Sequence, residues 1–126
     1  MHGSVPRTIA LAVSLVVFTV VSASADGVEK RGHCSGGRGE WRLEVRAETG
    51  GRLRVRFGIE HVPPGQAWQI FLSDDGVGIY SGTRRTDRHG EVRVTVDRAD
   101  RRGRDRMAAS GVSMASGVSC EGSLTL

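Results

Sequence analysis

The chain has 126 residues, of which 38% are hydrophobic and 5% aromatic, and its 18 basic and 14 acidic side chains give a formal net charge of +4. This length allows one domain with a small core and excludes two independent ones. The basic excess is mild and spread among acidic residues, which argues against a nucleic-acid-binding surface.

The first 25 residues have the three parts of a secretory signal peptide. Arg7 supplies a basic start, residues 9–21 form an apolar run, and Ala23 and Ala25 make a small-residue peptidase site. The apolar run is shorter than the roughly 20 residues that a membrane-spanning helix needs. We therefore expect cleavage after Ala25 and a secreted mature chain without a membrane span.

Residues 26–39 are polar and glycine-rich apart from Val28, and we expect them to form a flexible N-terminal segment. An even number of cysteines in an exported chain predicts a disulfide, here between Cys34 and Cys120. Closing so long a loop is worth ~4–5 kcal/mol in the loop-entropy model. His33 beside Cys34 raises the alternative of a metal site, but two cysteines without CxxC spacing are weak support for one.

From residue 40 onward, apolar residues recur at every second position, which is the period of a half-buried strand. Glycine, proline and aspartate clusters separate the apolar runs. This pattern predicts an all-β fold, an antiparallel β-sandwich spanning residues 40–126. The seven expected strands cover approximately residues 40–48, 52–60, 67–73, 77–82, 91–97, 105–112 and 117–125.

The first expected hairpin has a predictable register. Odd-numbered residues are apolar on both strands, so a three-residue loop at residues 49–51 keeps both apolar sets on one face. This register opposes Glu48 to Arg52, Glu44 to Arg56, and Arg46 to Arg54. In the second hairpin, Trp68, Ile70 and Leu72 share one face, and Phe71 with Tyr80 falls on the other, but the pattern selects no register.

Two groups of arginines stand out, at opposite ends of the expected strand 91–97. The first is Arg84, Arg85 and Arg88, which we take as candidate contacts to an anionic ligand. The second comprises the five arginines between residues 98 and 106, and it is nearly half neutralised by neighbouring aspartates. A codon bias toward arginine would explain both groups without any function.

The chain lacks the recognised short motifs of enzyme and cofactor sites, namely the phosphate loop, the dinucleotide fingerprint, GxSxG and HExxH. His33, His61 and His89 each lie beside an expected turn or terminus, where a solvated histidine is usual. The run from Asp74 to Gly78 lacks the alternating acidic spacing of a calcium loop and is typical of a tight hairpin turn. We therefore expect no catalytic residue, no metal and no cofactor.

Two stretches resemble immunoglobulin-like and fibronectin type III domains. Residues 63–68, ending in Trp68, resemble the entry into their third strand, and residues 103–109 resemble the corner before their sixth, with Met107 where those families have tyrosine. The whole segment from Cys34 to Cys120 also resembles small secreted actinobacterial proteins. The resemblance implies a β-sandwich and implies no particular activity.

These observations favour a secreted, non-enzymatic binding module that acts at the cell envelope or in the extracellular space. Its partner would be an anionic envelope polymer or a secreted protein. Two alternatives stay open: a small secreted hydrolase or an inhibitor of one, and a structural component of the envelope.

Overall fold

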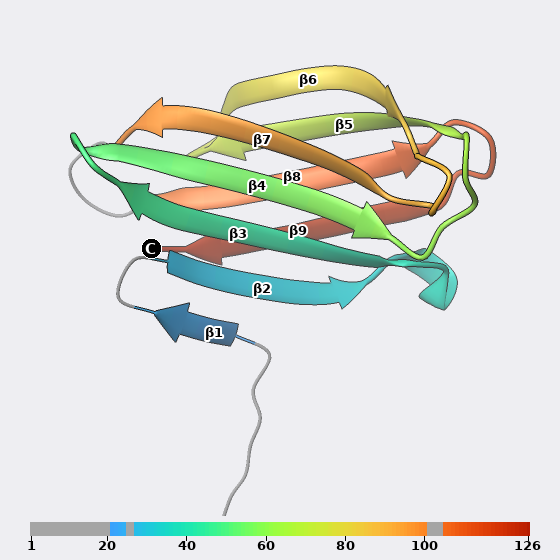
Figure 1. Cartoon of the computed structure of the whole chain (residues 1–126), viewed down its shortest axis with the longest axis horizontal. Coiled ribbons are helices and arrows are strands. Elements are labelled where there is room, and N and C mark those ends of the chain that lie inside the picture. The colour runs from blue at the N-terminus through green and yellow to red at the C-terminus, as the bar shows by residue number, and fades with distance from the viewer. Residues whose placement is uncertain (1–20, 25–26, 101–104) are drawn as a thin grey trace, which may run out of the picture.

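The computed structural model describes residues 21–24, 27–100 and 105–126, with the backbone alone for the first of these ranges. Two antiparallel sheets face each other, as Figure 1 shows. The five-stranded sheet has the order β1 (Val21–Ser24), β2 (Gly27–His33), β3 (Glu40–Glu48), β4 (Arg52–Glu60) and β7 (Val92–Ala99). The four-stranded sheet has the order β6 (Val77–Arg85), β5 (Ala67–Asp74), β8 (Arg106–Ser113) and β9 (Ser119–Thr125). A single 3-10 turn, η1 (Ser35–Gly37), joins β2 to β3.

The core lies between the two sheets and is built from the apolar residues of the alternating pattern. Alternate residues of β4 are buried, as the period of a strand with one dry face requires. Opposite them, the four-stranded sheet contributes large buried side chains. The side chains with under 2% exposure include Trp68, Phe57, Leu43, Ile59, Ile70, Leu72 and Met107.

The predicted sandwich is confirmed, and all seven predicted strands are present with their ends shifted by at most about three residues. In the first hairpin the predicted register is confirmed as well, since Glu48 opposes Arg52 and Arg46 opposes Arg54. In the second hairpin, a register shift between Leu72 and Ser73 interrupts the pairing of β5 with β6. The second hairpin therefore has no single register for the alternating pattern to predict.

Two strands, β1 and β2, lie outside the seven that were predicted. Residues 27–33, expected to be flexible, form β2 and pair along their length with β3. The side chains of β2 do not alternate between buried and exposed, because Val28 and its neighbours are only partly covered at this side of the sheet. Backbone pairing alone defines such a strand, and backbone pairing leaves no periodic signal in the sequence.

The expected signal peptide lies outside the described residues except for Val21–Ser24. These four residues form β1, which pairs antiparallel with β2. Among the described residues, no helix has the length and apolar character needed to cross a bilayer.

The predicted disulfide is present. Cys34 and Cys120 are bonded, with their Cα atoms 4.2 Å apart, and both are buried. Cys34 directly follows β2 of one sheet and Cys120 lies in β9 of the other, so the bond links the two layers of the sandwich.

Candidate functional site

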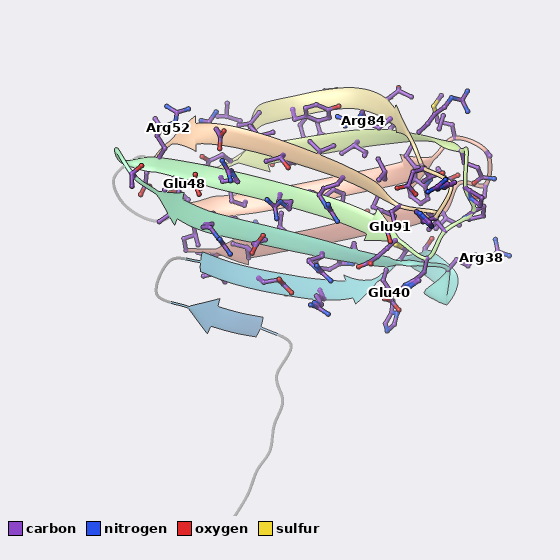
Figure 2. All side chains as sticks on the ribbon, viewed as in Figure 1. Arg38, Glu40, Glu48, Arg52, Arg84 and Glu91 are labelled. Carbon is purple, nitrogen blue, oxygen red and sulfur yellow. A yellow bond between two sulfur atoms is a disulfide. The ribbon has the colours of Figure 1, made fainter. Side chains whose placement is uncertain are left out.

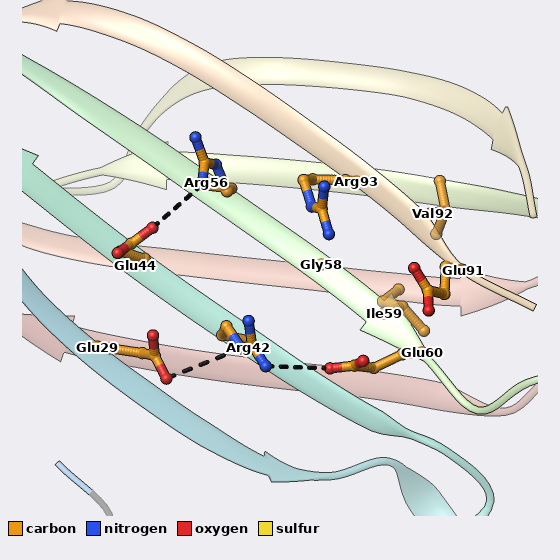
Figure 3. Close-up of a pocket in the computed structure, with 10 residues that line it drawn as sticks. All are labelled: Glu29, Arg42, Glu44, Arg56, Gly58, Ile59, Glu60, Glu91, Val92 and Arg93. Carbon is orange, nitrogen blue, oxygen red and sulfur yellow. Dashed lines mark hydrogen bonds and ion pairs between the residues drawn. The ribbon is translucent and has the colours of Figure 1, made fainter. Parts of the chain in front are cut away.

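The outer side of the five-stranded sheet is rich in arginine and glutamate, which alternate along β3 and face three arginines of β4, and we call it the charged face. Figure 2 shows these side chains across the sheet, from Glu48 and Arg52 at one end to Glu40 and Glu91 at the other. A hollow of about 220 Å³ lies in this face (Figure 3). Its lining residues are Glu29, Arg42, Glu44, Arg56, Gly58, Ile59, Glu60, Glu91, Val92 and Arg93.

Gly58 causes the hollow, which we call the Gly58 hollow. In the register of the sheet, Gly58 lies between Arg42 of β3 and Arg93 of β7. Neighbours in this row are close enough for their side chains to meet, but Gly58 has no side chain to fill the gap. A Cβ atom placed on Gly58 would meet only the Val92 carbonyl oxygen, at 3.8 Å. The floor of the hollow is therefore open.

Three glutamates of the hollow already have arginine partners. Glu29 lies 2.6 Å from Arg31, whose guanidinium pKa it raises above the ordinary value through the hydrogen bond between them. Glu44 lies 3.6 Å from Arg56. Glu60 lies 3.5 Å from Arg42. These pairs neutralise most of the charge on this face, and each is worth little at an exposed surface.

Arg93 and Glu91 differ from these pairs. Neither side chain has an ion-pair partner among the described residues, and Figure 3 shows Arg93 beside Gly58 with no dashed line to it. The Nε atoms of Arg42 and Arg56 are buried and lack a hydrogen-bond acceptor within the described part of the chain. The hollow thus presents one unpaired, exposed guanidinium, that of Arg93, because the Nε atoms of Arg42 and Arg56 are closed to solvent.

The candidate residues Arg84, Arg85 and Arg88 do not converge. Arg84 and Arg85 are the last two residues of β6 rather than loop residues, because β6 extends three residues beyond its expected end. Arg84 donates to the Arg93 carbonyl oxygen at 3.3 Å, whereas Arg85 donates to the Gly65 carbonyl oxygen at 2.8 Å. Arg88 lies in the following turn and contacts the ring of His89. Only Arg84 therefore approaches the strand that carries Arg93.

The turn that holds Arg88 is organised by an aspartate. The Asp87 carboxylate accepts hydrogen bonds from the backbone N–H groups of His89 and Glu91, at 2.8 and 3.1 Å. These two bonds hold the pKa of Asp87 below its ordinary value. The turn leads directly into β7, so it also sets the position of Glu91 at the rim of the Gly58 hollow.

The three mature histidines are dispersed. His61 is exposed and lies 3.1 Å from Glu40, while His33 ends β2 and His89 lies in the turn beside Arg88. The structure does not bring them together with one another.

The outer side of the four-stranded sheet has a different character. A shallow hollow of about 360 Å³ is centred on residues with small side chains, and Phe71 lies on it with 45% of its surface exposed. We call this surface the Phe71 face. Its other lining residues are Ser73, Arg106, Ala108, Ala109, Ser110, Glu121, Gly122 and Ser123.

The sequence carries one signal for the Gly58 hollow, an isolated glycine inside a predicted strand. An isolated glycine within a strand marks a weakened position or a close approach, and Gly58 interrupts an otherwise unbroken run from Arg52 to Glu60. Its neighbours across the sheet could not be known without the pairing of β4 with β7.

Comparison of the chain with family models, with curated proteins and with solved structures finds no match in any of the three.

Proposed function

We propose that this protein is a non-enzymatic binding domain that acts outside the cytoplasm, and that the Gly58 hollow receives a carboxylate or phosphate group of its partner. The observation that carries the proposal is Arg93, an exposed guanidinium without a carboxylate partner among the described residues, beside a hollow that has room for a ligand group.

A guanidinium is well suited to this role because its planar donors match the two oxygens of a carboxylate or phosphate. Arg56 and Arg42 flank the same hollow and each keeps one Nε donor without an acceptor. These Nε atoms are buried, and that of Arg42 lies 3.8 Å from Glu29, so the exposed guanidinium of Arg93 is the group that would contact the anion. Glu91 directly precedes β7, and the lining holds four glutamates and three arginines in all, so the unpaired Arg93 rather than the net charge of the hollow would hold the anion.

The size of the hollow favours binding over catalysis. At about 220 Å³ it is smaller and more polar than the pockets that enclose whole small-molecule ligands, which typically measure ~300–1,000 Å³. It can hold one charged group of a longer molecule. A polymer with repeated anionic groups, or an acidic segment of a secreted protein, fits this description.

A location outside the cytoplasm is supported by the buried Cys34–Cys120 disulfide, because such bonds persist in oxidising compartments. The expected signal peptide supports the same location. Cleavage after Ala25 would remove β1 and leave β2 as the edge of its sheet.

A relationship to immunoglobulin-like and fibronectin type III domains is part of the proposal. Counting from β3, Trp68 lies in the third strand and Met107 in the sixth, and both side chains are fully buried. The chain distributes consecutive strands between two sheets, as these sandwiches do. This architecture hosts many unrelated functions, so the likeness supports the fold, and the binding role rests on the Gly58 hollow.

Calorimetric titration of the mature protein with polyphosphate and with poly-L-glutamate at low salt tests the proposal. The two probes carry the two anionic groups under consideration. We expect both to bind, and we expect Arg93→Gln to weaken binding by about tenfold or more, since a charge-assisted hydrogen bond contributes ~1.5–3 kcal/mol.

Two further variants make the titration specific. Gly58→Thr fills the hollow with a residue that suits a strand and should abolish most of the binding while leaving the melting temperature unchanged or higher. Arg52→Gln removes the same charge as Arg93→Gln from the far end of the charged face and serves as the matched control. An equal loss in the two arginine variants, or full binding by Gly58→Thr, would refute the site.

A further inference from the structure

Three aspartates meet at one end of the sandwich. Asp74 ends β5, Asp75 lies in the turn to β6, and Asp105 directly precedes β8. One carboxylate oxygen from each lies within 4.8 Å of the other two. We call this group the aspartate cluster.

The backbone holds the cluster in place. The Asp75 N–H donates to the Arg106 carbonyl oxygen at 2.9 Å, and the Arg106 N–H donates to Asp75 Oδ1 at 2.8 Å. The Leu126 N–H donates to the Asp105 carbonyl oxygen at 2.9 Å. The turn after β5, the start of β8 and the end of the chain are thus tied together around the three carboxylates.

The charge within the cluster is only partly compensated. Asp74 and Asp105 are 4% and 2% exposed, respectively. Arg98 contacts Asp74 Oδ2 at 3.2 Å, but Asp74 Oδ1 is buried and has no hydrogen-bond partner within the described residues. Among the described residues, the three carboxylates and the Arg98 guanidinium leave a formal charge of −2. A buried carboxylate oxygen without a partner is costly, so a ligand that supplies positive charge here would stabilise the fold.

We propose that the aspartate cluster binds one Ca²⁺ ion. Ca²⁺ prefers oxygen ligands at about 2.3–2.6 Å, and two oxygens on opposite sides of such an ion are ~4.6–5.2 Å apart. The three carboxylates are therefore close enough together to contact one ion. Its charge would bring the cluster with Arg98 to neutrality.

The same geometry favours Ca²⁺ over other divalent ions. Zn²⁺ prefers nitrogen and sulfur ligands, and the cluster offers only oxygen. Mg²⁺ requires shorter bonds and near-ideal octahedral geometry. Asp75 is exposed, so an ion can enter from solvent and water can complete its coordination. With few protein ligands the site belongs with weak extracellular modules, whose dissociation constants are ~10⁻⁴–10⁻³ M.

Thermal unfolding and calorimetry of the mature protein with CaCl₂, after treatment with a chelator, test this inference. We expect one ion per chain and a melting temperature that rises with Ca²⁺ and saturates at about 10 mM, well above the expected dissociation constant. MgCl₂ should produce a smaller rise. The absence of a saturable rise with Ca²⁺, or an equal response to both ions, would overturn the proposal.

Asp75→Asn removes one charged ligand without disturbing the turn. Asn tolerates the left-handed backbone found at this position, where φ is 52°, and its amide oxygen can still accept from Arg106. We expect this variant to fold and to bind Ca²⁺ at least tenfold more weakly. Asp97→Asn on the charged face removes an equal charge away from the cluster and should bind Ca²⁺ like the wild type. Unchanged binding by Asp75→Asn would contradict the assignment.

The alternative to a bound Ca²⁺ ion is a proton shared between Asp74 and Asp105. In that case Ca²⁺ would leave the melting temperature unchanged at every pH, and calorimetry would detect no bound ion. The result of the Ca²⁺ titration does not depend on anion binding, because the Gly58 hollow lies on the outer face of the other sheet.

Discussion

The two outer faces of the sandwich follow the same alternating pattern but carry different chemistry. On the charged face, cross-strand ion pairs such as Arg54 with Asp97 at 3.3 Å neutralise one another, whereas Arg93 at the Gly58 hollow has no carboxylate partner among the described residues. On the Phe71 face most side chains are small, and an aromatic ring lies exposed among them. Alternation determines which residues face solvent, whereas function depends on which of them lack a partner within the protein.

The largest expected effect comes from cutting the covalent link between the two layers. Replacing Cys34 and Cys120 with serine should lower the free energy of unfolding by ~4–5 kcal/mol, a large part of the total for a domain of this size. Denaturant unfolding measures this change. A loss below about 1 kcal/mol would mean that the core alone holds the two sheets together.

A pair of glycines, one from each sheet, should respond in opposite ways to alanine. Gly122 of β9 faces the ring of Trp41, and an added Cβ would collide with that ring. Gly122→Ala should therefore destabilise the protein by ~1–3 kcal/mol. Gly58→Ala should be neutral or slightly stabilising, because the floor of the hollow is open. Thermal unfolding of both variants checks the contrast, and equal destabilisation would show that the hollow has no free space.

Buried Asp105 of the aspartate cluster and exposed Asp87 should change the free energy of unfolding with pH in opposite directions. Burial, followed by the charges of Asp74, Asp75 and Asp100 and a hydrogen bond with the Asp74 side chain, raises the pKa of Asp105 above its ordinary value. The folded state therefore holds this proton more tightly than the unfolded state. The resulting stabilisation is complete below the unfolded pKa, near 3.8, and is lost as the pH rises through the folded pKa.

Asp105→Asn tests this linkage in metal-free protein, because asparagine cannot titrate. The variant should have a higher melting temperature than the wild type at pH 7 and a smaller difference near pH 4. For Asp87 the pH dependence of the free energy of unfolding has the opposite sign. Its lowered pKa gives a stabilisation that is present above pH 3.8 and is lost as the pH falls further. An unchanged pH profile in Asp105→Asn would show that Asp105 titrates normally.

The smallest effect is expected on the Phe71 face. Phe71→Ser removes the exposed ring and should change the free energy of unfolding by less than about 1 kcal/mol, since nearly half of the ring is already in solvent. Binding of polyphosphate should not change. A loss of polyphosphate binding comparable with that of Arg93→Gln would show that the ligand binds on the four-stranded sheet instead.

The sandwich could be predicted from the sequence because strand alternation and turn residues are local signals. The disulfide followed from cysteine number, and the register of the first hairpin followed from the parity of Val45 and Val55. β2 could not be predicted, because a partly covered strand shows no alternation. The two candidate sites depend on long-range contacts: Gly58 gains its neighbours only when β4 pairs with β7, and Asp105 reaches Asp74 only through the pairing of β5 with β8.

The most direct test of the account is a map of amide chemical shifts during titration of the mature protein with polyphosphate. We predict that the largest shifts occur at Gly58, Glu91 and Arg93, with little change at Phe71 and Ser110. Shifts centred on the Phe71 face, or spread evenly over every exposed arginine, would contradict the assignment of the Gly58 hollow as the binding site.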